Sequence, residues 1–315
     1  MGVTTSWAGE GNRWILTAVD INGSATMIAI YWNTVARWIM MRAKRDAAAL
    51  NTPLFLLQAA DASTPAMPVA VAAKMMNEAA PRNTGGMHGL LPVHLGMRVR
   101  LLEALDLGSG LVKDAEGDVV RIEPNELDED MVNEALERNQ PMVYLQHLPK
   151  GVWVRMEKYK NAPFKEQLRR CDDSLIPGET QGLVFVEVRT SDAFDYRNYT
   201  VRRTGLPLSH GRVITCTACQ GRTMHAGVII DCARLESGPH PKHEDDWWLE
   251  LYVMLSRATR IDDLLLMRAP PASFLLRGPP KSLRKQLDKF AARTGECRRK
   301  AARLAVELGF EEFLH

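Results

Sequence analysis

The sequence predicts an α/β protein that carries an all-β insertion and ends in a basic helical segment. An alternation of predicted strands and helices occurs twice, once near each end of the chain, and favours the α/β class; we call each occurrence a rhythm. Between them, short β-rich runs alternate with Gly, Pro and charged turns, a pattern typical of a small barrel. The chain has 315 residues, of which 46% are hydrophobic and 25% charged. These values allow one large or two smaller globular domains and argue against a disordered or fibrous protein.

The first rhythm lies within the N-terminal quarter of the chain. Met27–Ile30 and Leu54–Leu57 are short apolar runs that predict buried strands. Asn33–Ala49 lies between them and carries its apolar residues at helical spacing. We therefore expect these three segments to form a βαβ unit.

The second rhythm begins with a helix expected from Ser209 to Gln220, because Ser209 is a good N-cap residue and Gly221 occupies the place of a C-terminal cap. An apolar strand is then expected at Val228–Ile230, and another at Leu264–Met267.

Asp245–Ala258 lies between those two strands and predicts a helix. It is apolar on nearly every side, so we expect it to be buried all round. On this basis Tyr252 is expected to pack in the core and not to act as a stacking platform for a ligand.

The inserted β module is predicted at residues 92–190. Its strands are expected at Met97–Leu102, Asp118–Ile122, Gly151–Met156 and Leu183–Val188. Its acidic stretch, residues 123–137, is interpreted as a solvated helix or loop. The remaining boundaries are an N-terminal extension at 1–24, an α/β domain formed by 25–91 and 191–272, and a basic helical tail at 273–315.

The C-terminal tail is the one strongly cationic segment. Between Lys281 and Arg303 it carries nine Lys and Arg residues against Asp288 and Glu296. Two interpretations stand side by side: Lys281, Arg284 and Lys285 lie along a phosphate backbone, or the helix is simply solvated. In both cases we expect its apolar residues to pack on the body; these are Leu283, Leu287, Phe290 and Ala291.

Charge and cysteine usage limit the compartment and the partners. Forty Lys and Arg balance 38 Asp and Glu, so net charge alone predicts no polyanion partner. Five cysteines, an odd number, argue against a secreted disulfide framework and favour an intracellular location; the sequence does not distinguish the nucleus, the mitochondrion and the cytoplasm.

The longest uncharged N-terminal stretch, Ile21–Ala36, is too short and polar to span a membrane. The opening MGVTTS fits an N-myristoylation pattern, but no second anchor follows it.

Three segments carry a family resemblance when they are taken together. They are residues 84–120, 202–231 and 247–270. The segment at 202–231 contains the strings PL, TCTACQG and GVIID, and the segment at 247–270 contains YVMLSR. Runs expected in the β module read GMRVRLL, GLVKDAEGDVV, LPKGVWVRM and GLVFVEV. In order and spacing, these strings resemble the C-terminal half of superfamily 1 DNA helicases of the RecD/PIF group, over roughly residues 25–270.

The resemblance implies a second RecA-like domain, a parallel sheet with helices on both faces, into which an SH3-like barrel is inserted. YVMLSR corresponds to the family's motif VI, which implies that Arg257 is a catalytic arginine finger and that Ser256 lies near the nucleotide. The alternative is a surface arginine favoured by the helix dipole. Arg260, about one turn further on, is interpreted as a cap or surface residue.

TCTACQG corresponds to motif V. The resemblance implies that Gln220 and Gly221 lie near the nucleotide cleft and that Thr215 and Thr217 contact single-stranded DNA. The family's His-Lys pair is Thr217-Ala218 here, and its Ser is Cys219. Loss of a phosphate-neutralising cation is expected to weaken DNA affinity, so DNA contact at this point stays open.

Cys216 and Cys219 also form a C-x-x-C string, with Cys232, His240 and His243 downstream. Structural zinc needs four converging ligands, which this spacing does not supply within one element. We therefore expect buried thiols and no metal site, with zinc or a redox pair as the alternatives.

No P-loop string, G-x-x-x-x-G-K-[ST], occurs in the sequence. In a helicase motor that loop holds the phosphates of ATP. We therefore expect ATP and Mg²⁺ only if a P-loop RecA-like domain is supplied in trans or by an upstream part of the same gene. The expected function is the C-terminal part of an ATP-dependent DNA helicase that is not an ATPase alone. The alternatives are a non-enzymatic nucleic-acid-binding module and a helicase remnant that serves as an interaction scaffold.

Overall fold

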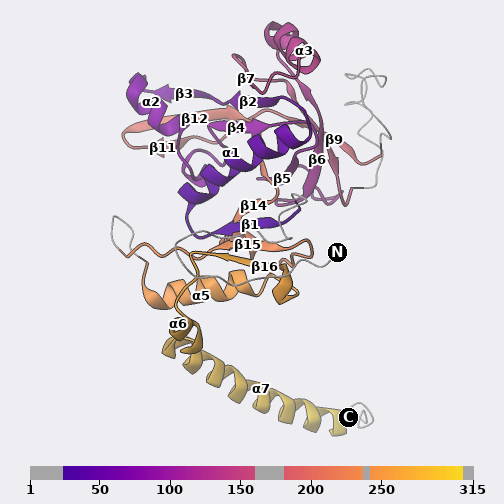
Figure 1. The fold of residues 1–315 in the computed structure, drawn as a ribbon. Helices are drawn as coiled ribbons and strands as arrows, with labels where there is room; N and C mark the ends of the chain where they lie inside the picture. The colour runs from indigo at the N-terminus through magenta and orange to yellow at the C-terminus, as the bar shows by residue number, and fades with distance from the viewer. Residues whose placement is uncertain (1–23, 160–180, 237–241, 308–315) are drawn as a thin grey trace, which may run out of the picture.

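A computed structural model describes residues 24–159, 181–236 and 242–307 (Figure 1). Its first sheet has four parallel strands in the order β14-β1-β15-β16. The strands are β1 (Thr26–Ala29), β14 (Val213–Thr215), β15 (Val228–Asp231) and β16 (Leu264–Met267). The strands predicted at the positions of β1, β15 and β16 are confirmed to within a residue at each end.

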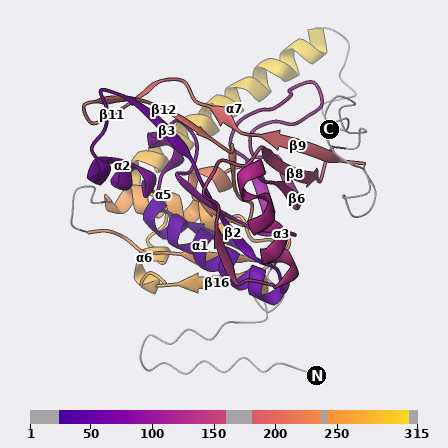
Figure 2. The ribbon, with the colours of Figure 1, turned by 90° about the horizontal axis from the view of Figure 1, so that it is seen from above.

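Helices cover both faces of the parallel sheet, α1 (Trp32–Ala49) on one and α5 (Glu244–Leu255) on the other (Figure 1). In the view from above, the two helices therefore overlap (Figure 2). The alternation of side chains along β1 explains this arrangement, since neighbouring residues in a strand point to opposite faces. Met27 and Ala29 pack in the cluster that contains α1 residues, whereas Ile28 packs in the cluster that contains α5 residues. The predicted α/β class, with a parallel sheet between helices, is confirmed.

The β-rich middle of the chain forms a five-stranded antiparallel sheet in the order β13-β5-β6-β8-β9. Many of its residues pack in the largest hydrophobic core of the described residues. The strands are β5 (Arg98–Leu101), β6 (Glu116–Glu123), β8 (Gly151–Met156), β9 (Leu183–Glu187) and β13 (Leu208–His210). The four strands predicted in this region are confirmed, and β13 joins them from further along the chain.

Two smaller sheets complete the body. One has the order β4-β2-β7, and in the other β12 pairs with β3, β10 and β11. Their strands are β2 (Leu54–Gln58), β3 (Ala60–Thr64), β4 (Leu90–Val93), β7 (Met142–Tyr144), β10 (Arg189–Thr190), β11 (Phe194–Tyr196) and β12 (Tyr199–Gly205). The predicted βαβ unit is therefore wrong, because β2 pairs with β4 and β7 and not with β1. An apolar run identifies a buried strand but does not identify its neighbour.

The helix predicted from Ser209 to Gln220 is also wrong. The segment forms β13, β14 and a single 3-10 turn, η5 (Thr217–Cys219). Val213, Ile214 and Thr215 are β-branched and pair with β1, which favours a strand over a helix. Ser209 is fully buried and does not cap a helix; its hydroxyl lies 3.0 Å from His88 Nε2.

Helix α5 is buried on one side and not all round. Trp247, Leu251 and Met254 are buried against the sheet. Tyr252 is 59% exposed and stacks on Trp248, with 5.6 Å between the ring centroids. The predicted core position of Tyr252 is wrong, because a helix lying on one face of a sheet presents its opposite side to solvent.

The remaining α-helices within the described residues are α2 (Val69–Met76), α3 (Glu129–Glu137), α6 (Ala272–Leu276) and α7 (Lys281–Glu307), with 3-10 turns η2 (Pro81–Asn83), η3 (Glu126–Asp128) and η6 (Ile261–Asp263). The acidic stretch forms η3 and α3. Asp128 is buried within it, and its carboxylate accepts hydrogen bonds from the backbone N and the Nδ1 of His147.

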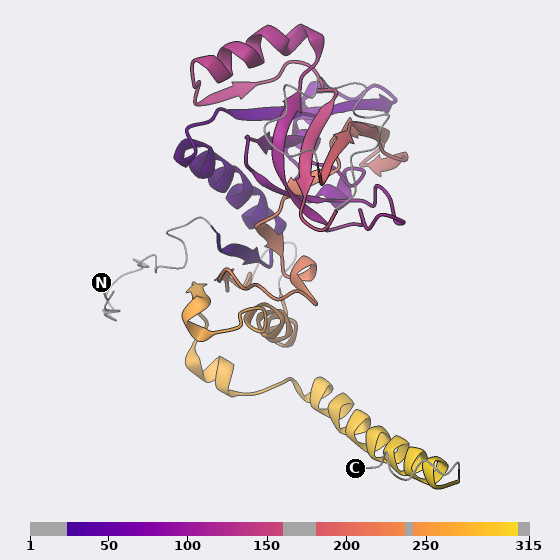
Figure 3. The same ribbon diagram turned by 90° about the vertical axis from the view of Figure 1, so that its right-hand side faces the viewer.

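Helix α7 is one continuous helix that extends away from the body (Figures 1 and 3). None of its described residues is buried. Leu287 and Phe290 are 50% and 62% exposed, so the prediction that the apolar residues of this helix pack on the body is wrong. The helix begins after Pro279 and Pro280, in a direction that keeps most of its length off the sheets. Among the described residues, no helix has the length and apolarity needed to cross a bilayer.

Candidate functional site

The site predicted from the sequence lies where β14 leads into the turn η5. Thr215 ends the strand and is buried, and its hydroxyl accepts a hydrogen bond from the backbone N of Ala218 at 3.3 Å. Thr217, Gln220 and Gly221 follow on the exposed side of the turn. Gly221 has a φ of 75°, a left-handed conformation that favours glycine and turns the chain back toward α5.

Arg257 lies just after the last turn of α5 and is partly buried. Its Nε donates to the carbonyl of Val253 at 2.8 Å, which is the contact of an arginine that caps its own helix. Its Nη1 reaches across to the carbonyl of Arg222 at 2.9 Å, and its Nη2 donates to the Ser256 hydroxyl. All three described partners are uncharged oxygens. The guanidinium is thus held in place while its positive charge has no described carboxylate partner.

The backbone also ties the two segments together. The N–H of Met224 donates to the carbonyl of Arg257 at 2.9 Å, and Met224 and Ala258 form an isolated parallel bridge. The structure therefore brings Arg257 and Ser256 beside the turn that carries Gln220 and Gly221. These residues come from two pairs that lie far apart in the sequence, and the fold brings the two pairs into one group.

Arg222 connects this group to the antiparallel sheet. Its guanidinium forms an ion pair with Glu116 of β6, which also pairs with Arg98 of β5 at 3.2 Å. Arg98 pairs in turn with Asp118 and Glu157. Burial is the main cause that lowers the pKa of Arg222. This ion-pair network was not predicted, and only the charged residues scattered through these strands could have indicated it.

A second residue that was not predicted is Asp231, at the carboxyl end of β15. Its carboxylate is buried and forms a two-point ion pair with Arg268, with 2.8 Å between Arg268 Nε and Oδ1. Oδ1 also accepts from the backbone N of Ala233. The sequence signal is the acid that ends the apolar run GVIID. The carboxyl ends of parallel strands are where ligands bind in α/β folds, although this carboxylate is already paired.

The cysteines around η5 lie in the core that joins α5 to the sheet. Cys216 and Cys219 are buried, and the Cys219 thiol donates to the carbonyl of Cys216 at 2.9 Å. The hydrogen bond with Cys219, followed by burial, raises the pKa of Cys216. Burial chiefly raises the pKa of Cys232 to about 12.

The described His, Asp and Glu residues near these cysteines do not form a zinc site with them. His243 caps α5, its Nδ1 accepting from the backbone N of Asp245, and His240 lies outside the described residues. Within residues 24–159, 181–236 and 242–307, no three His, Cys, Asp or Glu side chains converge as a metal site.

The basic tail is not brought to Arg257. Arg284 donates to the carbonyl of Arg277, and Arg277 pairs with Glu244 and Asp245 at the first turn of α5. Arg257 follows the opposite end of that 12-residue helix, about 18 Å away along its axis. Lys281, Arg284 and Lys285 are exposed on the first turns of α7 and form a separate cationic surface.

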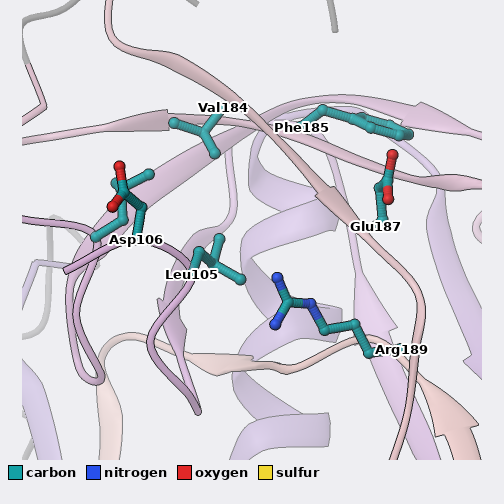
Figure 4. A pocket seen from close by; sticks show the side chains of 7 residues that line it. Leu105, Asp106, Val184, Phe185, Glu187 and Arg189 are labelled. Carbon is teal, nitrogen blue, oxygen red and sulfur yellow. The ribbon is translucent and has the colours of Figure 1, made fainter. Parts of the chain in front are cut away.

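A small pocket lies beside strand β9 of the antiparallel sheet (Figure 4). It is lined by Leu105, Asp106, Leu111, Val184, Phe185, Glu187 and Arg189. The Arg189 side chain extends toward Leu105 in this view, and its Nη1 pairs with Glu103 at 3.0 Å. None of the predicted site residues lines this pocket.

The fold is similar to solved structures of Pif1 helicases. The crystal structure of Pif1 helicase from Candida albicans aligns with a TM-score of 0.50 and 15% identity, over 89% of this chain and 52% of that one. Bacteroides Pif1 bound to ssDNA aligns with a TM-score of 0.45 and 14% identity, over 86% of this chain and 46% of that one. Bacteroides Pif1 in complex with ADP-AlF3 and ssDNA aligns with a TM-score of 0.46 and 13% identity, over 89% of this chain and 48% of that one.

This chain therefore spans about half the length of the Pif1 chains that it matches. Neither a protein-family profile nor a curated protein sequence matches it. The similarity is one of fold: a parallel sheet, antiparallel sheets and a long C-terminal helix, in an arrangement consistent with a Pif1 helicase domain.

Proposed function

We propose that this chain acts as the C-terminal part of a PIF- or RecD-like ATP-dependent DNA helicase, in which Arg257 is the arginine finger. The observation that carries the proposal is the state of Arg257, whose guanidinium is fixed by uncharged oxygens at the end of α5. A charge that is held in place but not neutralised can stabilise the negative charge that develops on a transferring phosphoryl group. The likeness of the fold to the Candida albicans Pif1 helicase supports this assignment.

The residues of this chain fit only one side of such a site. Arg257 supplies a cation, and Gln220, Gly221 and Ser256 lie beside it. The sequence contains no P-loop to hold the phosphates, so the chain alone does not fit ATP and Mg²⁺. The nucleotide would be held by a P-loop RecA-like domain, and this chain would add the arginine and, through the exposed Thr217, part of a grip on single-stranded DNA. The buried Thr215 would support that grip by holding the turn that carries Thr217.

Steady-state ATP hydrolysis tests the proposal. The purified chain should show no turnover above background, with or without a thymidine oligonucleotide. With the P-loop domain supplied in trans, hydrolysis should appear, and Arg257→Ala should lower it by about 10³-fold or more while nucleotide binding is retained.

Arg260→Ala is the matched control, because Arg260 is exposed and its described partner is Asp262 at 3.4 Å. It should leave the rate of hydrolysis within about twofold of the parent protein. Turnover by the chain alone, or equal losses in the two variants, would contradict the assignment of Arg257.

A second candidate, a non-enzymatic nucleic-acid-binding module, is favoured by the exposed cations of α7, which include Lys281 and Lys285. Deletion of residues 281–315 should then remove most of the salt-dependent affinity for single-stranded DNA. If the helicase assignment holds instead, substitutions at Thr217 should reduce that affinity more than the deletion does.

A further inference from the structure

Helix α7 carries an apolar seam along its 27 residues. The residues of the seam are Leu283, Leu287, Phe290, Thr294, Cys297, Ala301 and Leu304. They recur alternately four and three residues apart, which gives a period of 3.5 residues. That period places them on one narrow stripe and is the pattern of the a and d positions of a coiled coil.

The part of the body that the structure describes does not cover this seam. None of the described residues of α7 is buried, and Leu304 is 54% exposed. Figure 3 shows that the helix runs outward from its start, so that the sheets lie beyond reach of most of its length. A row of exposed apolar side chains on a continuous helix is a feature of an interaction surface.

Four of the five charged residues at the e and g positions that flank the seam are cationic, the exception being Glu307. Arg284 and Arg298 occupy e positions, and Arg293 and Lys300 occupy g positions. In coiled coils, the charges at e and g select the partner. A parallel pairing of two copies of α7 would place Arg293 of one copy beside Arg298 of the other, and an antiparallel pairing would also oppose cations. A second copy is therefore disfavoured, whereas acidic side chains would be complementary.

The narrow width of the seam favours a helix as the partner over a membrane surface or nucleic acid. A helix that lies in a membrane surface needs an apolar face about 100° wide or more, and here four of the eight e and g positions beside the seam are arginine or lysine. Nucleic acid would pair with the cations but would leave Leu287 and Phe290 in water. An acidic helix satisfies both features at once, since its apolar stripe would cover the seam.

We propose that α7 docks an acidic amphipathic helix of another protein, one whose own heptad stripe is bordered by Glu and Asp. Thr294, at the middle of the seam, and Ala301, nearer its C-terminal end, are small, so the two helices could approach closely along this part of the contact. The cations on the outer side of α7, such as Lys285 and Lys289, remain exposed in this arrangement and stay available for other contacts.

Fluorescence anisotropy with two synthetic four-heptad peptides tests the proposal. Both peptides carry Leu at the a and d positions; one carries Glu at e and g, and the other carries Lys. The full-length chain should bind the Glu peptide at least about tenfold more tightly than the Lys peptide at 0.1 M salt, with a preference that shrinks as salt rises.

The double variant Leu287→Ser/Phe290→Ser should lower affinity for the Glu peptide by about tenfold or more, because it removes two exposed apolar side chains from the seam. The matched variant Lys285→Ser/Lys289→Ser changes the outer side of the same helix and should alter affinity by less than about threefold. Circular dichroism should show equal helix content in both variants, since all four side chains are exposed.

Three results would overturn the proposal. The first is equal binding of the two peptides. The second is sedimentation of the protein as a dimer that the seam variant dissociates, which would assign the seam to a second copy. The third is a loss of binding to a thymidine oligonucleotide or to phosphatidylserine vesicles in the seam variant, with peptide binding unchanged. Arg257→Ala should leave peptide binding unaltered, so this test is independent of the proposed helicase function.

Discussion

Arg222 and Glu116 form an ion pair that joins the turn after η5 to strand β6 of the antiparallel sheet. The backbone carbonyl of the same Arg222 accepts a hydrogen bond from Arg257 Nη1. One residue thus contacts both the end of α5 and the antiparallel sheet. Through it, the position of the Arg257 guanidinium is linked to a sheet formed by a different part of the chain.

Glu116→Gln should lower the free energy of unfolding by about 1–3 kcal/mol, because both Arg222 and Arg98 lose a charged partner in a partly buried position. A double-mutant cycle with Arg222→Met, followed by urea denaturation, should give a coupling free energy of about 1 kcal/mol or more. The exposed pair Arg260–Asp262 provides the comparison and should give less than about 0.5 kcal/mol. Equal coupling in the two pairs would show that the Arg222 contact does not stabilise the fold.

Asp61→Asn should be among the more damaging single substitutions. Arg203 is fully buried, and its Nε and Nη2 donate to the two carboxylate oxygens of Asp61 at 2.7 and 2.8 Å. Removing the carboxylate leaves a buried guanidinium without its counter-charge, which costs about 3–5 kcal/mol. Thermal denaturation should show a large fall in Tm. The exposed control Glu126→Gln, which weakens the pair with Lys150, should change the free energy of unfolding by less than about 0.5 kcal/mol.

The stability of the protein should fall in mild acid because of buried histidines. Burial is the main cause that lowers the pKa of His210 to about 3, and nearby Arg42 adds to the effect. Burial likewise lowers the pKa of His88 to about 3. In the unfolded chain these groups bind protons below pH 6.5, so the free energy of unfolding should decrease as the pH falls from about 6.5 toward about 3.

The variant His210→Asn should reduce that dependence on pH, because it removes one of these titrating groups. The Oδ1 of asparagine occupies a position similar to that of His210 Nδ1 and can still accept the hydrogen bond that the backbone N of Arg212 donates. Urea denaturation at pH 7 and pH 4.5 should show a smaller difference in the variant than in the parent protein. Equal differences would mean that His210 is not responsible.

Local sequence patterns predicted three of the four strands of the parallel sheet and missed β14. The strands at 26–29, 228–231 and 264–267 are short apolar runs between turn residues, and the helix that follows the first of them has a clear apolar stripe. Such features depend on residues close together in sequence, which periodicity can detect. The pairing of β2 depends instead on strands about 35 and 88 residues later, and no local pattern encodes that choice.

The candidate site was predicted only in part, for a related reason. Arg257 and Gln220 were selected through their resemblance to motifs, but the segment before Gln220 was predicted as a helix and forms a strand and a 3-10 turn. The ion pairs of Arg222 and Asp231 join residues that are distant in the sequence, and charged residues of either type are common on any surface. The exposure of Tyr252 was missed because an apolar helix does not reveal which of its sides meets the sheet.

Gly89→Ala should destabilise the protein through a clash between backbone atoms. A Cβ at Gly89 would lie 2.2 Å from the carbonyl oxygen of Met76, the last residue of α2. Gly89 also accepts a hydrogen bond from the backbone N of Ala59, which limits how far it can move. The expected loss is about 1–3 kcal/mol in the free energy of unfolding, measured by urea denaturation.

Gly108→Ala is the control, because its Cβ would lie 3.4 Å from the Asp106 carboxylate, which is an ordinary contact. This variant should change the free energy of unfolding by less than about 0.5 kcal/mol. Comparable losses in the two variants would mean that α2 moves freely and that Gly89 is not needed for its close approach.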